Sequence, residues 1–254
     1  MLLEILDHIF SFLVPHWETL IACSKDPVLS PIVEKYLYHH LIINIGDQKT
    51  PPHSLTPDQL SKLVLENPRI LYHVRILQIQ FGIEHLWVEG TEAVMAQHLD
   101  EFANLLLMFP VLECIMLISL NDSRWDLPDA FRAALEDRLN LPTITEAHIE
   151  DVKGFSLSLF DNCASLKKLT LVGSFRRCDT TSAQPQLQSL TVDIGLASMP
   201  PLYMAWIKLH IKELQSLKCE TASVRQERPL PEFLGVCSQT LTKLDIFISE
   251  FSEC

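Results

Sequence analysis

The first residues of the chain carry apolar side chains around most of the circumference of a predicted helix. The polar residues of the segment 2–13 are Glu4, Asp7, His8 and Ser11. On a helix their spacing of i, i+3, i+4 and i+7 places them on one narrow stripe. An ordinary surface helix buries one face and exposes the other to water. We therefore expect this helix to be covered on more than one side, by its own chain or partly by another protein.

Two further segments continue this N-terminal region. The segment 16–24 supplies a short apolar run, and the segment 30–44 begins with Ser30 as a candidate N-cap and Pro31 at the first helical position. The pattern thus predicts three short helices within residues 1–44. Such a unit is too small to bury all of its apolar surface alone.

Beyond residue 44 one short pattern recurs: an apolar residue, two others, an apolar residue, one other and an apolar residue. It occurs at 74–79, 112–117, 144–149, 166–171, 187–192, 214–219 and 241–246. The last five segments begin at intervals of 22, 21, 27 and 27 residues, and leucine-rich repeats have periods of about 20–29. We expect each segment to form a short strand that points its apolar residues into a shared core. The alternative is a chance scatter of leucines in a leucine-rich chain.

Helices are expected between these strands. Residues 56–59, Thr-Pro-Asp-Gln, combine the spacing of a capping box with proline at the first helical position, and the helix they open ends near Asn67. Further helices are expected at 91–109, 130–139 and 231–239. The alternation predicts the α/β class, with residues 45–254 forming a strand–helix solenoid. Because no repeat has the asparagine of regular leucine-rich repeats, the array is a degenerate version.

Composition narrows the possible functions. The net charge of -12 argues against a nucleic-acid surface, which needs clustered lysine and arginine. Only 7 glycines are present, which disfavours the glycine-rich loops of nucleotide-binding enzymes. The 7 cysteines include no Cys-x-x-Cys pair, so we expect free thiols in a reducing compartment, cytoplasmic or nuclear.

Neither apolar segment of the chain has the features of a membrane or targeting signal. The segment 105–120 is shorter than a bilayer span of about 20 residues, and Pro110 and Glu113 interrupt it. The N-terminal segment lacks the positive charges that begin a secretory signal. We expect no membrane partner.

No constellation of residues typical of an enzyme is present. The sequence has no zinc-protease motif, nucleophile elbow, phosphate loop or dinucleotide fingerprint. His148 and Glu150 have the His-x-Glu spacing of zinc deaminases, but the Pro-Cys-x-x-Cys partner is missing. We expect no catalytic residue, metal or cofactor. An enzyme whose site is assembled from distant residues remains as an alternative.

The N-terminal residues resemble a known family. Glu4-Ile5-Leu6-x-x-Ile9-Phe10-x-x-Leu13 is followed by Leu20-Ile21-Ala22-Cys23-Ser24, by Pro31-Ile32-Val33 and by Tyr38-x-x-Leu41. This order resembles the F-box, particularly that of fungal F-box proteins, over roughly residues 1–44. The resemblance implies a helical module that binds the Skp adaptor of an SCF-type cullin–RING ubiquitin ligase. The residues expected at the adaptor interface or in the core of the module are Leu3, Ile5, Leu6, Ile9, Phe10, Leu13 and Leu20.

The repeat array would then capture the protein target of the ligase. Residues between the core positions are expected on the concave face of the sheet, where repeat proteins bind partners. They are Glu146, His148, Glu150, Lys168, Thr170, Asp193, Lys218, Glu220, Asp245 and Phe247. The face is mixed but mostly acidic, which favours a partner with basic or polar features. Phe247 is the expected anchor, because aromatic residues dominate interface energies.

The sequence therefore predicts a non-catalytic substrate-recognition adaptor. The alternative function is a leucine-rich-repeat scaffold that does not engage a ligase. The alternative interpretation of residues 2–13 is a helix that only caps the following domain. Since only residues 247–254 follow the last repeat, without the polar cap that solenoid ends usually need, we also expect a chain truncated at its C-terminus.

Overall fold

One parallel sheet forms the centre of the molecule. The computed structural model describes residues 2–13, 16–46, 53–82, 91–119, 127–152, 155–173, 185–193, 201–221 and 234–248. Within these residues the sheet has nine strands in the order β2-β1-β3-β4-β5-β6-β7-β8-β9. Every neighbouring pair is parallel. The expected α/β class is confirmed.

The recurring apolar pattern locates the strands correctly. The strands are β1 (His40–Ile45), β2 (Ser54–Leu55), β3 (Ile76–Phe81), β4 (Cys114–Ser119), β5 (Glu146–Glu150), β6 (Lys168–Val172), β7 (Ser189–Asp193), β8 (Ser216–Thr221) and β9 (Lys243–Ile248). All seven predicted strands are present, and each begins at the third residue of its pattern. The strands β1 and β2 were not expected.

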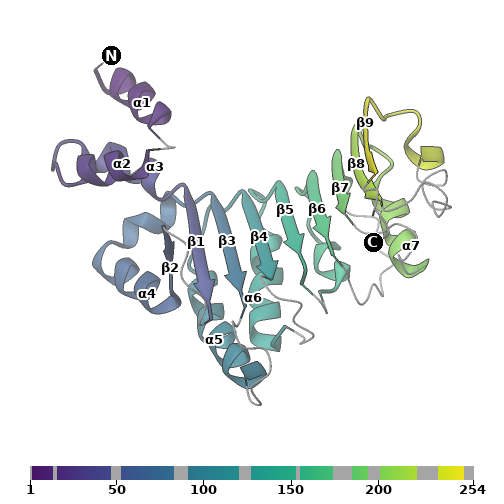
Figure 1. Ribbon diagram of the computed structural model, residues 1–254, viewed down its shortest axis with the longest axis horizontal. Helices are drawn as coiled ribbons and strands as arrows, with labels where there is room; N and C mark the ends of the chain where they lie inside the picture. Colours follow the sequence, from purple (N-terminus) through teal and green to yellow (C-terminus); the bar gives the residue numbers. More distant parts are fainter. Residues whose placement is uncertain are drawn as a thin grey trace, which may run out of the picture.

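Helices occupy most of the connections. They are α1 (Leu2–Phe12), α2 (Trp17–Ser24), α3 (Ser30–Leu37), α4 (Pro57–Glu66), α5 (Thr91–Leu106), α6 (Asp129–Leu139) and α7 (Pro201–His210), with 3₁₀ helices η1 (Pro68–Tyr72) and η2 (Leu157–Phe160). In Figure 1, α5 and α6 lie behind the sheet, while α1, α2 and α3 lie beyond the end at which β1 begins. The helices expected at 91–109 and 130–139 are confirmed. The helix expected at 231–239 lies partly outside the described residues. Within its described part, residues 234–237 are helical.

The expected third N-terminal helix is shorter than the pattern suggested. It ends at Leu37, and His40–Ile45 form β1, which pairs with β3 from His40 and Ile76 onward. The prediction that Ser30 caps this helix is also wrong. Leu29 occupies the N-cap position, and Ser30 is the first helical residue, whose hydroxyl donates to Glu34 Oε1 at 3.1 Å.

A constant register aligns the apolar positions of successive strands. Leu77 of β3 pairs with Ile115 of β4, and Ala147 of β5 pairs with Leu169 of β6. All four of these side chains are buried. The last apolar position of the pattern forms a second buried row from β3 to β8, as Ile79 and Leu117 illustrate, whereas Ile246 of β9 is 41% exposed. One face of the sheet thus packs into a continuous core beneath the helices.

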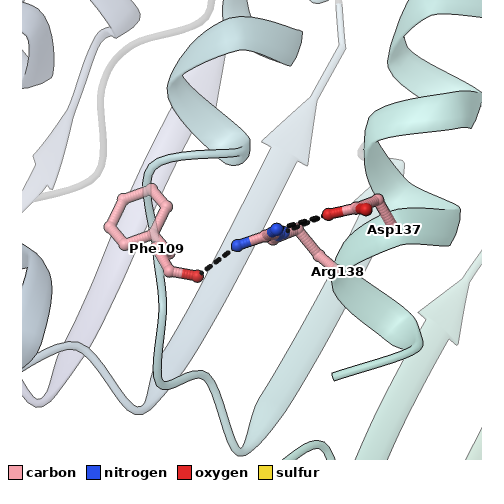
Figure 2. Close-up of polar contacts among 3 residues, drawn as sticks. All are labelled: Phe109, Asp137 and Arg138. Atoms are coloured by element: carbon pink, nitrogen blue, oxygen red, sulfur yellow. Dashed lines mark hydrogen bonds and ion pairs between the residues drawn. The ribbon is translucent and has the colours of Figure 1, made fainter.

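Two local interactions fix helices in this array. The capping box predicted for α4 is confirmed, with Gln59 N–H donating to Thr56 Oγ1 at 3.3 Å and Gln59 Oε1 accepting from Thr56 N–H at 2.9 Å. On α6, Arg138 donates to the Phe109 carbonyl oxygen at 2.9 Å and also binds Asp137 (Figure 2). This side chain therefore joins α6 to the chain that leaves α5.

Candidate binding surfaces

The three N-terminal helices enclose a small core of their own. Phe10, Leu20, Val33 and Leu37 are buried together, with Leu6 and Leu13 packed partly against them. Among the residues predicted for the adaptor interface or the module core, Leu6, Phe10, Leu13 and Leu20 therefore belong to the core. The side chain of Leu3 lies outside the described residues.

The opposite side of α1 presents an apolar stripe to solvent. Ile5 is 51% exposed, Ile9 47% and Phe12 67%. Their spacing of i, i+4 and i+7 aligns them on one side of the helix, and we call these three residues the α1 stripe. Ile5 and Ile9 were predicted as candidates, whereas Phe12 was not. Its spacing of three residues from Ile9 and seven from Ile5 is the sequence signal that could have identified it.

The face of the sheet turned away from α5 and α6 forms a second surface. In Figure 1 no labelled helix lies in front of β3, β4, β5 and β6. We call this side, made of the residues between the core positions of each strand, the open face. Glu146, His148 and Glu150 occupy its three positions on β5, and register places Lys168, Thr170 and Val172 beside them.

The remaining predicted target-binding residues occupy equivalent positions on later strands. Lys218 of β8 pairs with Asp245 of β9, and Glu220 pairs with Phe247. Asp193 of β7 pairs with Glu220. The strand positions of Asp193 and Glu220 are described, while their side chains are not. The register therefore brings the predicted residues of β5, β6, β7, β8 and β9 to one face.

Acidic side chains pair with basic ones along this face. Glu146 lies 3.6 Å from Lys168, Nε2 of His148 lies 2.9 Å from a Glu150 oxygen, and Lys243 lies 2.9 Å from Asp245. The ammonium of Lys218 sits 4.9 Å from the centroid of the Phe247 ring, a cation–π arrangement. Phe247 is 50% exposed, so the ring is available to a partner.

The part of the open face nearest the N-terminal helices carries apolar side chains among uncharged polar ones. Ile42, Ile76, Met116 and Ile118 are partly exposed on β1, β3 and β4. We call these four residues the apolar end of the open face. Sequence reasoning missed them as binding candidates. The available signal was that these four positions between the core residues are apolar, although Asn44, Gln78 and Gln80 on the same strands are polar.

Burial changes the pKa of two titratable groups at this end. Burial, reinforced by Glu146, raises the pKa of the Cys114 thiol to about 12. Such a thiol is protonated and a poor nucleophile near neutral pH. Burial lowers the pKa of His40, although the hydrogen bond between its Nε2 and Gln78 Oε1 at 3.1 Å acts in the opposite direction. Among the described residues, no group of three or more His, Cys, Asp or Glu side chains could hold a metal ion.

Comparisons with other proteins leave the family open. No protein-family model, curated protein or solved structure matches the chain. In the described part of the chain, no helix combines the length and the apolar character needed to cross a bilayer.

Proposed function

We propose that this protein is a substrate-recognition adaptor of an SCF-type cullin–RING ubiquitin ligase. Its N-terminal helices bind the Skp adaptor, and its repeat array binds a protein target. The protein acts by raising the effective concentration of the target beside the ligase rather than by catalysis. Its repeat array is a degenerate leucine-rich-repeat solenoid.

The observation that carries the proposal is the exposed α1 stripe. Exposed apolar side chains that form one contiguous patch are typical of protein interfaces. Ile5, Ile9 and Phe12 remain accessible even though Phe10 and Leu20 complete a core within the same helices. The stripe lies in the segment that resembles the F-box, so we infer that the Skp adaptor covers it.

The sheet supports the second half of the proposal. Strands that follow one another in sequence also follow one another in space, in one parallel register from β3 to β9. Stacked units of this kind are typical of repeat arrays, which bind partners on an extended face. The open face, with its paired charges and exposed Phe247, is the part of this sheet we assign to the target.

Co-purification of the whole chain with the Skp adaptor tests the proposal. We expect a stable complex with the unaltered chain. Ile9→Asp and Phe12→Asp should each weaken it about tenfold or more, because each places a charge in a desolvated contact. Leu65→Asp is the matched control, since Leu65 is an apolar residue on α4 that is 82% exposed.

The unfolding temperature of each variant separates lost binding from lost folding. We expect Ile9→Asp, Phe12→Asp and Leu65→Asp to unfold within a few degrees of the unaltered chain. Failure of the unaltered chain to bind the Skp adaptor, even with the adaptor in excess, would remove the ligase role. A protein-binding scaffold would then be the remaining function.

A further inference from the structure

The open face has a sharp chemical border between β4 and β5. On the β4 side it carries Cys114, Met116 and Ile118, and on the β5 side Glu146, His148 and Glu150. Register sets Met116 beside His148 and Ile118 beside Glu150. Neighbouring strands lie about 4.8 Å apart, so an apolar row and a row with two carboxylates lie within the reach of one bound segment.

The carboxylates at this border are only partly neutralised. The side chain of Glu150 is 37% exposed and pairs with an imidazole, which carries a charge only when protonated. Glu146 pairs with Lys168 at 3.6 Å, and the Glu146 side chain is 45% exposed. The border therefore places two carboxylates beside partly exposed apolar groups. A cation supplied by a partner would form a charge-assisted hydrogen bond with the Glu150 carboxylate.

We propose that the open face over β3, β4 and β5 binds a segment of a target protein that combines apolar side chains with lysine or arginine. This inference rests on the proposed target-binding role of the sheet. The apolar side chains of the segment cover Ile76, Met116 and Ile118, and its cations pair with Glu146 and Glu150. An acidic segment is disfavoured, because it would bring like charges together as water is excluded.

This site is distinct from the surface around Phe247. Phe247 lies on β9, and β6, β7 and β8 separate that strand from β5. Its environment also differs, because Lys218 already supplies a cation to the ring. The two regions are therefore chemically different parts of the open face, and the preference for lysine and arginine is assigned to the border alone.

Selection from a displayed library of random peptides against the whole chain tests the proposal. We expect enrichment of peptides that contain both lysine or arginine and leucine, isoleucine or phenylalanine. The double variant Glu146→Gln, Glu150→Gln should weaken the selected peptides about tenfold or more, and added salt should weaken their binding to the unaltered chain. Met116→Gln should weaken them by a similar factor, whereas Glu66→Gln, the matched control on α4 whose side chain is 64% exposed, should change the affinity less than twofold.

A reversed selection gives a second readout. With Glu146→Lys and Glu150→Lys in place, the enriched peptides should become acidic while keeping their apolar residues. No enrichment, enrichment without a charge preference, or selected peptides whose affinity responds to Glu66→Gln as strongly as to the changes at Glu146 and Glu150 would each overturn the proposal. Measuring Skp-adaptor binding on the same variants separates the two proposals, because it depends on the α1 stripe and should not change.

Discussion

Gly46 closes β1 at a backbone position that excludes larger residues. Its φ is +128°, a conformation that L-amino acids with side chains rarely adopt. A Cβ atom at this position would lie 2.1 Å from the Gly82 carbonyl oxygen, at the end of the neighbouring strand β3. Both the conformation and the contact therefore require glycine where β1 and β3 end together.

We predict that Gly46→Ala lowers the free energy of unfolding by about 2 kcal/mol or more, because strain and a backbone clash add together. Gly235→Ala is the matched control, since a Cβ atom there meets nothing within 4 Å. It should leave the stability unchanged or slightly higher. Denaturant unfolding of both variants measures the difference in their free energies of unfolding. Equal values would contradict the conclusion that position 46 requires glycine.

At the residue scale the sequence predicted which face a side chain occupies better than how far it is buried. Strand alternation correctly grouped Glu146, His148 and Glu150. The N-terminal helix gave no such separation between Ile9 and Phe10, because both belong to a nearly continuous apolar run. Their burial differs because α2 and α3 cover Phe10 and leave Ile9 at 47% exposure.

At the scale of elements, the pattern of spaced apolar residues was a strong predictor of strands. It failed at β1 because the assignment extended the preceding helix through His39 and His40, where no proline or glycine marks an end. Tyr38, Leu41 and Ile43 follow the same pattern as the later strands. The helix α7 was missed because its sequence carries no capping-box signal. The strand β2 was missed because two residues are too few to show a period.

Arg138 shows how one side chain connects successive units. Its side chain is 15% exposed and donates to the Phe109 carbonyl oxygen, which follows α5 (Figure 2). We predict that Arg138→Ala lowers the free energy of unfolding by about 1–3 kcal/mol, because a partly buried carbonyl loses a charged donor. Lys62→Ala is the control, since Lys62 forms an ion pair on α4 with its side chain 78% exposed, and should cost about 0.5 kcal/mol or less.

Thermal or denaturant unfolding compares the two variants directly. If Arg138→Ala proves no more destabilising than Lys62→Ala, then the bridge between α5 and α6 contributes little. Packing of Phe102 against Phe131, whose ring centroids are 6.4 Å apart, would then account for the joining of these helices.

At the scale of the whole molecule, the two proposed surfaces lie on different parts of the chain. The α1 stripe belongs to helices at one end of the long axis, and the sheet continues away from them to β9 at the other end (Figure 1). Each part also has its own buried core, and partly buried Tyr38 packs against both. Binding at one end therefore need not disturb the other, as an adaptor that joins a ligase to its target requires.

The separate cores predict that the N-terminal helices unfold before the sheet. Among the described residues, the core of these helices contains four buried side chains with partly buried ones packed around them. Phe10→Ala typically costs about 3–5 kcal/mol, which should exceed the stability of such a small unit. Hydrogen exchange should show lost protection in α1, α2 and α3, with β3, β4, β5 and β6 still protected. Phe12→Ala, the control on the exposed side of α1, should leave both regions protected. Equal loss of protection in the helices and the sheet after Phe10→Ala would mean that Tyr38 couples the two cores into one cooperative unit.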